Sequence, residues 1–345
     1  MKSLLVSFFL CCGIAHPARN MDAYVIDVEG GKSVLVVAPS GESLLFDLGW
    51  PGYDGRDSDR IVKAAHAAGL KQIDYLVVSH YDLDHMGDVP LLISKIPVKH
   101  IVDHGDLQTS GKGVEQRYRA YAEARDRLPH TAVKPGDRIP VKGINVLVVT
   151  SAMQYLETAL KGAGTPNGLC STTTAKPELP QDKEDNMSVG LLFGYGKFRM
   201  LDLADFEWAY DHKLMCPNNP FGSVNVYMVS VHGQDKGVSP VLAQALNARV
   251  AIMGNGATKG GAPQTWDTLK GAPGLQDIWQ SHYSIAAGAD RNPPADFIAN
   301  PDAAEDQAFW IRLSARSDGS FTVTNSRNGF SKTYAPAVTK LARSR

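Results

Sequence analysis

An excess of charge of either sign is missing from this sequence of 345 residues. The chain has 35 Lys and Arg residues against 36 Asp and Glu residues, which gives a formal net charge of −1 at neutral pH. This balance argues against a strongly basic nucleic-acid surface and against an acidic tail, although it leaves room for a local basic groove. The hydrophobic fraction of 43% is ordinary for a globular protein and suffices for a sizeable core.

Long apolar runs are also missing beyond the first residues of the chain. Ser3–Ala15 is a short apolar segment that follows a positively charged start and ends in small residues. This pattern matches an export signal, and the segment is shorter than the roughly 20 residues that cross a bilayer. We predict cleavage after Ala15 or Ala18, so that residues 1–18 are a signal peptide and the mature chain is periplasmic or secreted. An uncleaved N-terminal anchor is the alternative, and no later segment is predicted to cross a membrane.

Cysteine is scarce, with four residues in the whole chain. Cys11 and Cys12 lie in the predicted signal, so only Cys170 and Cys216 remain in the mature protein. Both lie in polar stretches rich in Gly, Pro and Asn, which we interpret as loops. An oxidising compartment is compatible with a Cys170–Cys216 disulfide, but the spacing alone does not show that the two residues meet.

The pattern along the chain indicates one layered α/β domain over residues 20–335, without repeats or a low-complexity linker. Three β-branched runs separated by turn residues predict an antiparallel meander at the start, and a second hairpin is expected at Trp310–Val323. Residues 161–185 are rich in Gly, Pro and Thr and are interpreted as a long loop or lid. The other predicted strands and helices are Ser58–Ala68, Gly113–Leu128 and Val89–Ser94 as helices, and Asp74–Ser79, Val98–Asp103, Ser188–Phe193, Phe198–Asp202, Asn225–Val231 and Arg249–Met253 as strands.

The sequence does contain a dense group of metal-ligand side chains. Residues 79–88 read S-H-Y-D-L-D-H-M-G-D and directly follow a predicted strand. A tight turn at this point brings His80, Asp82, Asp84 and His85 toward one small volume. Imidazole and carboxylate groups suit Zn²⁺ or a similar divalent ion, and four ligands in one turn favour two adjacent ions. The alternative is a solvated turn whose aspartates cap the next helix, which leaves both histidines unexplained.

The spacing H-x-D-x-D-H resembles the H-x-H-x-D-H motif of the metallo-β-lactamase superfamily. The form with aspartate in place of the second histidine is similar to the branch that contains the hydrolase domain of ComEC-type DNA-uptake proteins. Val25–Ser33, Leu45–Gly49, Lys134–Asp137 and Asn186–Ser188 also resemble segments of that branch, so the resemblance extends over residues 20–260. It implies an αββα sandwich of the metallo-β-lactamase type, with the metals at its edge between two β-sheets.

The same resemblance implies roles for particular residues. His80 and Asp82 belong to the first metal, and Asp84 and His85 belong to the second. A metal-bound hydroxide then attacks the substrate, since a divalent ion lowers the pKa of bound water to near 7. Asp82 or Asp84 is the candidate that accepts or relays the proton.

Two further ligands are implied later in the chain. In Leu201–Asp205 the register of the family motif assigns the bridging aspartate to Asp205, with Asp202 as the rival. The late histidine of the family falls on His232. Its usual histidine neighbour is Val231 here, and Gln234 stands where the family has serine.

The middle histidine of the superfamily has no histidine at its place, because the matching stretch is Asp185–Ser188. This leaves open whether one metal or two are held. Asn186 in that stretch, His104 after the strand at Val98–Asp103, and His282 beside two aromatic residues are candidate substrate contacts, and His104 is also a candidate substitute ligand. The alternatives are an exposed loop histidine for His104 and a packed aromatic cluster for His282.

The sequence therefore predicts an exported metal-dependent hydrolase that uses Zn²⁺, with Mn²⁺ as an alternative ion. The resemblance favours a phosphodiester or small-molecule substrate, whereas the charge balance does not support nucleic acid. The sequence shows no Ser/His/Asp arrangement and no phosphate-cradling glycine loop that would indicate a different catalytic mechanism. The alternative from another class is a non-catalytic periplasmic or secreted binding module on a degenerate metal site.

Overall fold

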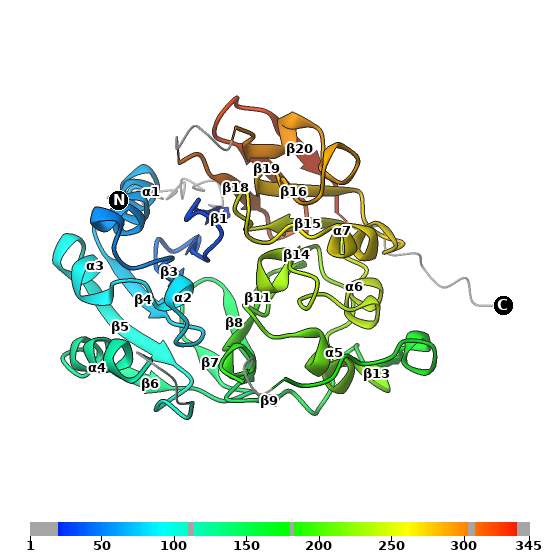
Figure 1. The fold of residues 1–345 in the computed structure, drawn as a ribbon, viewed down its shortest axis with the longest axis horizontal. Coiled ribbons are helices and arrows are strands. Elements are labelled where there is room, and N and C mark those ends of the chain that lie inside the picture. Colours follow the sequence, from blue (N-terminus) through cyan, green and yellow to red (C-terminus); the bar gives the residue numbers. More distant parts are fainter. Residues whose placement is uncertain (1–19, 110–113, 180–182, 303–307, 337–345) are drawn as a thin grey trace, which may run out of the picture.

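A computed structural model describes residues 20–109, 114–179, 183–302 and 308–336 (Figure 1). The predicted signal peptide, residues 1–18, lies outside this part of the chain. Within it, two mixed β-sheets, each of nine strands, pack face to face, and helices cover their outer faces. None of the described helices is both long enough and apolar enough to cross a bilayer.

The first sheet combines the two ends of the chain. Its strands follow the order β20-β19-β18-β1-β2-β3-β4-β5-β6, in which β1 to β3 are antiparallel and β3 to β6 are parallel. The predicted N-terminal meander and the C-terminal hairpin of β18 and β19 are thus confirmed. The strands are β1 (Met21–Val25), β2 (Val34–Val37), β3 (Ser43–Phe46), β4 (Ile73–Val77), β5 (Val98–Asp103), β6 (His130–Ala132), β18 (Ile311–Ala315), β19 (Phe321–Asn325) and β20 (Ser331–Tyr334).

The second sheet is built from the middle of the chain. Its order is β17-β16-β15-β14-β12-β11-β8-β7, with β9 paired to β8, and the strands from β12 to β17 are parallel. Parallel strands place their carboxyl ends at one edge of the sheet. The strands are β7 (Arg138–Ile139), β8 (Asn145–Ser151), β9 (Gln154–Tyr155), β11 (Gly190–Tyr195), β12 (Phe198–Asp202), β14 (Val226–Met228), β15 (Val250–Met253), β16 (Asp277–His282) and β17 (Ile298–Asn300).

Helices form the two outer layers. The layer on the first sheet contains α1, α3 and α4, and the layer on the second contains α5, α6 and α7 (Figure 1). Side-chain caps begin two of them: Asp88 accepts a hydrogen bond from the Leu91 amide at the start of α3, and Ser239 accepts one from the Leu242 amide at the start of α6. The helices are α1 (Arg56–Ala67), α2 (Leu83–Met86), α3 (Val89–Lys95), α4 (Val114–Arg125), α5 (Trp208–Met215), α6 (Pro240–Leu246) and α7 (Pro263–Lys270).

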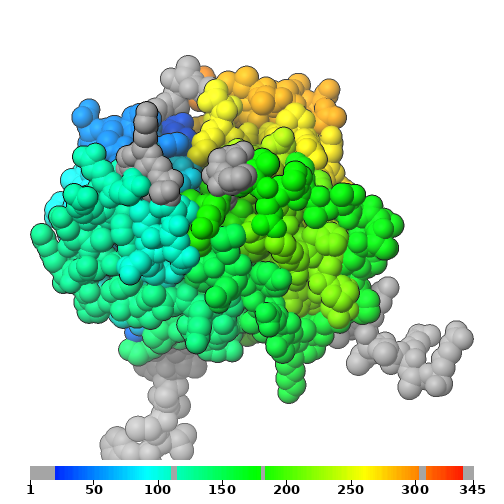
Figure 2. All heavy atoms as spheres, turned by 60° about the horizontal axis from the view of Figure 1, so that its bottom comes forward, coloured from blue at the N-terminus to red at the C-terminus, as the bar shows by residue number. Residues whose placement is uncertain are grey.

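The core between the sheets is continuous and apolar. Phe46 and Val77 of the first sheet and Val148, Phe193 and Trp279 of the second are all fully buried in it. Alternate residues of the strands face this core, and the others face the helices, which accounts for the near-continuous apolar strand sequences. In the space-filling view the blue-to-cyan and the green-to-yellow parts of the chain lie directly against each other (Figure 2). The predicted αββα sandwich is confirmed.

Of the segment predicted as a loop or lid, residues 161–185, the described part before residue 180 packs against the helices of the second sheet. A short strand β10 (Thr165–Pro166) pairs with β13 (Asn218–Asn219), and a disulfide joins Cys170 to Cys216 across a Cα–Cα distance of 5.7 Å. The indole N–H of Trp208 on α5 donates to the Thr174 carbonyl at 3.3 Å. The segment is therefore attached to α5, and a lid function stays a prediction.

Candidate metal centre

The turn after β4 carries the first group of ligand-type side chains. It is closed by the amides of His85 and Met86, which donate to the Asp82 carbonyl at 3.1 and 2.9 Å and begin α2. The Leu48 amide donates to the His85 carbonyl at 2.8 Å and attaches the turn to the end of β3. His80, Asp84 and His85 are buried as a consequence.

Four buried residues from both sheets converge at this turn. Asp84 and His85 follow β4, Asp205 follows β12, and His232 lies in a 3₁₀ turn (Ser230–Gly233) after β14. His85 Nε2 lies 3.1 Å from His232 Nε2, 3.4 Å from Asp84 Oδ2 and 3.3 Å from Asp205 Oδ2. His232 Nε2 lies 3.1 Å from Asp84 Oδ2 and 3.2 Å from Asp205 Oδ2. These four residues are called the inner group below.

The spacing within the inner group fits a tetrahedral metal site. Four ligands at about 2.0–2.1 Å from Zn²⁺ stand about 3.3 Å from one another at the corners of a tetrahedron. The five measured donor distances, from 3.1 to 3.4 Å, bracket this value. Two imidazoles and two carboxylates are also a ligand set that Zn²⁺ accepts. The residues present therefore fit a divalent ion.

The pKa values of the inner group show how strongly its members interact. Burial by itself would lower the pKa of His85, but the carboxylates of Asp205 and Asp84 raise it well above the usual range. Burial would raise the pKa of Asp205, whereas His232 and His85 bring it well below the usual range. The histidines of the group therefore favour the protonated, positively charged form, and the carboxylates favour the ionised form. A divalent cation at the same point would replace these protons, so metal binding is expected to release them.

Asp47 orients one of the inner histidines. Its Oδ2 lies 2.9 Å from His85 Nδ1, and its Oδ1 accepts the Ser79 amide at 2.7 Å. A carboxylate that accepts a hydrogen bond from Nδ1 of a histidine fixes the ring and makes Nε2 a better metal ligand. Asp47 adopts a φ of 64°, an uncommon conformation that persists because these hydrogen bonds hold it. It is the aspartate of the Leu45–Gly49 motif.

A second group lies next to the inner group and contains His80, Asp82 and Asp185, called the outer group below. His80 Nε2 is 3.9 Å from Asp82 Oδ2 and 3.7 Å from Asp185 Oδ1, and within the described residues it has no hydrogen-bond partner. The Ser79 hydroxyl donates to Asp47, so its oxygen is available to accept from His80 Nδ1 at 3.0 Å. This arrangement leaves a lone pair on Nε2, as a metal ligand requires.

The outer group is the less complete of the two. The Asp82 side chain is 44% exposed, whereas the Asp185 side chain is only 10% exposed. Burial and the Asp205 charge raise the pKa of Asp185 to about 6. The Lys236 ammonium lies 2.6 Å from Asp185 Oδ2 and 2.7 Å from Glu207 Oε1, so it compensates part of this negative charge.

The structure separates the two rivals for the bridging position. Asp205 lies in the inner group, and its Oδ1 is buried without a hydrogen-bond partner among the described residues. Asp202, three residues earlier, instead accepts the Ala204 amide at 3.0 Å and forms an ion pair with Lys32 at 2.5 Å. Only Asp205 of the two is placed to hold a metal.

The segment around His232 has an unusual backbone. Val231 and His232 have φ values of 51° and 53°, a left-handed conformation that non-glycine residues rarely adopt. The Val231 amide donates to the Ala204 carbonyl at 3.0 Å, which ties the His232 turn to the segment that carries Asp205. Two consecutive residues with strained backbone at a ligand position are consistent with a functional site.

The three predicted substrate contacts lie outside the inner and outer groups, and His282 belongs to a third group of ligand-type residues with Asp27 and Glu29. Asn186 donates to Glu207 Oε2 at 3.0 Å, and the Glu207 amide donates back to Asn186 at 3.2 Å. His104 is buried against the Tyr81 ring and lies 3.3 Å from Glu184. His282 is buried and lies 2.7 Å from Asp27 Oδ1. These contacts are with the protein itself, and contact of any of the three with a substrate stays a prediction.

Three charged residues at the site were not singled out from the sequence. They are Asp185 of the outer group, Lys236, whose ammonium lies 2.6 Å from Asp185, and Lys259, whose ammonium contacts Asp84. The signal for Asp185 was present, because it begins the stretch that matches the position of the missing histidine. Lys259 lies in a glycine-rich stretch without a ligand-type motif, so nothing in the sequence pointed to it as part of the site.

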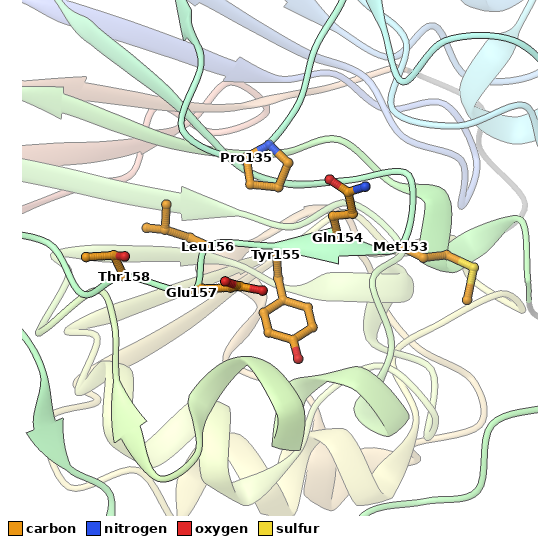
Figure 3. A pocket seen from close by; sticks show the side chains of 7 residues that line it. All are labelled: Pro135, Met153, Gln154, Tyr155, Leu156, Glu157 and Thr158. Carbon is orange, nitrogen blue, oxygen red and sulfur yellow. The ribbon is translucent and has the colours of Figure 1, made fainter.

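A separate cavity of about 530 Å³ lies beside the β8–β9 hairpin (Figure 3). It is lined by Pro135 and by residues 153–158, and the Tyr155 ring points away from Pro135 toward the helices (Figure 3). None of the residues of the inner or outer group lines it. This cavity is therefore separate from the candidate metal site.

Residues 26–160 match the family model described as the metallo-beta-lactamase superfamily. The matched residues include strands of both sheets, so the chain has the metallo-beta-lactamase fold. Among curated proteins, ComE operon protein 3 of Bacillus subtilis (strain 168) is 23% identical in an alignment of 279 residues that covers 74% of this chain. Those residues cover 32% of the relative, so the chain spans about a third of the length of that protein.

Two solved structures are similar to the chain at low identity. YhfI from Bacillus subtilis, a metallo-beta-lactamase fold protein, has 12% identity and a TM-score of 0.46, covering 75% of this chain and 96% of that chain. CmlA from Streptomyces venezuelae, a diiron beta-hydroxylase, has 13% identity and a TM-score of 0.39, with coverages of 76% and 48%. At these values the structures do not indicate an activity.

Proposed function

We propose that the protein is an exported metal-dependent hydrolase that cleaves phosphodiesters. The observation that carries this proposal is the inner group, in which donors from two sheets stand at the spacing of a tetrahedral site. A non-catalytic protein has no chemical need for two buried carboxylates and two buried histidines at one point, since such a group is costly to bury.

The residues of the chain divide the work between them. A divalent ion, when bound, supplies the nucleophile by lowering the pKa of a coordinated water molecule. Asp84, His85, Asp205 and His232 would hold this ion, and Asp47 keeps His85 oriented. Asp82, with its side chain 44% exposed at the mouth of the site, is positioned to exchange a proton with solvent. The role of Asp82 or Asp84 in proton transfer stays a prediction.

The carboxylate-rich ligand set favours a metal that prefers oxygen ligands and a substrate whose reacting centre carries several oxygens. The outer group has one histidine and two carboxylates, a mixture that suits Mn²⁺ as well as Zn²⁺. The resemblance to the branch of DNA-uptake proteins favours a phosphodiester over a β-lactam. The formal net charge of −1 gives no support for a long nucleic acid, so a small phosphodiester is the better first substrate.

Export is supported by two features that are independent of the site. The first is the short apolar N-terminal segment, and the second is the Cys170–Cys216 disulfide. Structural disulfides are typical of oxidising compartments and are rare in the bacterial cytosol.

The test is metal analysis of the purified protein together with hydrolysis of bis-(p-nitrophenyl) phosphate. The variant Asp84→Ala/His232→Ala removes two inner ligands, and Asp59→Ala/His66→Ala removes one exposed aspartate and one exposed histidine from α1 as a matched control. We expect metal-dependent cleavage in the wild type and in the control, and loss of both bound metal and cleavage in the first variant.

Other outcomes would contradict the proposal in different ways. Bound metal without phosphodiester cleavage would overturn the substrate class and redirect the search to esters, lactones and lactams. Absence of metal from a wild type that is folded and supplied with Zn²⁺ and Mn²⁺ would overturn the hydrolase itself. The non-catalytic binding module would then be the better description.

A further inference from the structure

We propose that Lys259 binds an anionic oxygen of the substrate and so restricts the site to anionic substrates. This inference rests on the proposed function and adds a residue that selects the substrate class. Lys259 lies 54 residues beyond Asp205 in the chain and belongs to neither metal group. Its selection rests on where its ammonium group lies.

Lys259 faces the inner group and solvent at once. Its ammonium contacts the Asp84 carboxylate and lies 4.5 Å from the centre of the Trp50 ring. The side chain is 30% exposed, so the cation is at the boundary between the buried donors and the surface. A cation over the face of an indole is stabilised there without consuming its hydrogen-bonding capacity.

The backbone holds Lys259 at this place. Gly260 has a φ of +82°, and a Cβ at that position would lie 2.1 Å from the His232 carbonyl oxygen, so only glycine fits. The Gly261 amide donates to the same carbonyl at 3.0 Å, and the Gly256 amide donates to the Lys259 carbonyl at 2.8 Å. The loop that carries Lys259 is therefore fixed to the turn that carries the ligand His232.

The charges of the site explain what Lys259 can do when a metal is bound. A divalent ion in the inner group would take over the negative charge of Asp84, and the Lys259 ammonium would then lack full compensation. Lys236 differs, because it lies between two carboxylates, Asp185 and Glu207. A partly buried ammonium next to a metal attracts an anion strongly, because the local dielectric constant is lower than that of water.

A non-bridging phosphodiester oxygen has the charge and size for this position. A neutral ester has no such charge and would gain little from Lys259. The geometry thus predicts discrimination between anionic and neutral substrates at one residue. A substrate carboxylate shares the anionic-oxygen chemistry, and a comparison of inorganic phosphate with acetate as ligands separates the two sources.

The experiment compares Lys259→Met, Lys259→Arg and a matched control. The control is Lys270→Met on α7, which removes a lysine whose ammonium lies 5.8 Å from the centre of the Trp266 ring, outside both metal groups. Each Zn²⁺-loaded protein is titrated calorimetrically with inorganic phosphate and with acetate, and its metal content is measured. Steady-state kinetics are recorded with bis-(p-nitrophenyl) phosphate and with the neutral p-nitrophenyl acetate.

We expect Lys259→Met to weaken phosphate binding and to raise KM for the diester by about 10-fold or more, the factor that loss of one charge-assisted hydrogen bond produces. Lys259→Arg should recover most of this loss, and Lys270→Met should match the wild type. Metal content should match the wild type in all variants. Turnover of the neutral ester should fall less in Lys259→Met than turnover of the diester, because the neutral ester has no anionic oxygen for Lys259 to bind before it reacts.

Three results would overturn the role of Lys259. One is unchanged phosphate affinity in Lys259→Met, and another is absence of phosphate binding by the wild type. The third is an equal loss with both substrates accompanied by loss of metal, which would make Lys259 a structural partner of Asp84. Failure of the hydrolase proposal is a separate result, because the phosphate titration needs no turnover.

Discussion

At the scale of single residues, the two aspartates at the end of β12 differ only in where their carboxylates point. Asp205 enters the inner group, while Asp202 forms an ion pair with Lys32. Successive side chains point in different directions where a β-strand ends in a turn. Two aspartates three residues apart can therefore differ in role, one as a metal ligand and the other as an ion-pair partner.

We expect Asp205→Asn to lower the affinity for Zn²⁺ by at least about 100-fold. Loss of a residue that only hydrogen-bonds to a metal ligand already lowers metal affinity by 10–100-fold. The matched variant Asp202→Asn should keep the affinity within about 10-fold and lose stability instead, since it leaves Lys32, whose side chain is only 11% exposed, without its ion-pair partner. Competition with a chromogenic chelator measures both affinities. Equal losses in the two variants would show that Asp205 is not a ligand.

The clustered ligands could be predicted from the sequence, whereas for Asp185 only the stretch that contains it could be. His80 to His85 lie in one turn, so their proximity follows from the chain itself. In the 3₁₀ helix Asp185–Met187, successive residues point about 120° apart. Asp185 therefore faces His80 while Asn186 faces Glu207, and the sequence alone does not say which of the two turns toward the site.

At the scale of secondary structure, the strands were more predictable than the helices of the second layer. The apolar composition of the sequence at β1 to β5 and at β12 and β15 is enough to predict these strands. The helices α5, α6 and α7 are seven or eight residues long. Too few turns fit into such a length to show a clear helical period, and the packing against the second sheet stabilises them instead.

One link between α5 and the start of α6 predicts how stability depends on pH. Asp211 on α5 accepts the Ser239 amide at 3.0 Å, and burial raises the pKa of its carboxyl to about 8. The folded state then keeps a proton that the unfolded state releases near pH 4, so this group lowers the free energy of unfolding as the pH rises from about 4 to about 8. Above pH 8 both states are ionised and its contribution is constant.

The variant Asp211→Asn lacks this titration. We expect its free energy of unfolding, relative to the wild type, to increase between pH 5 and pH 8 by up to about 4 kcal/mol. Urea denaturation at the two pH values measures the change. The control Asp59→Asn removes a carboxylate that is 64% exposed on α1 and should follow the wild type. A pH dependence of Asp211→Asn that parallels the wild type would mean that Asp211 is ionised in the folded protein.

At the scale of the whole molecule, the inner group joins the two halves of the sandwich. Asp84 and His85 follow a strand of the first sheet, and Asp205 and His232 follow strands of the second. An ion held by all four would cross-link the sheets at their shared edge. The unfolded chain does not assemble these residues, which are separated by up to 148 positions, so the ion binds the folded state selectively.

Metal binding should therefore raise the thermal stability of the entire protein. At a free Zn²⁺ concentration of about 1,000 times Kd, the folded state gains about 4 kcal/mol, which for a chain of this size raises Tm by roughly 5–10 °C. Differential scanning calorimetry of the protein stripped with EDTA, before and after addition of Zn²⁺, measures this shift. The variant Asp84→Ala/His232→Ala retains only one of the two ligands from each sheet, so its Tm should respond to Zn²⁺ by less than about 2 °C, because its occupancy at the same concentration is low. An equal rise in the variant would place the stabilising ion elsewhere in the molecule. No rise in the wild type would mean that Zn²⁺ does not bind the folded protein in preference to the unfolded chain, which would contradict a metal site in the inner group.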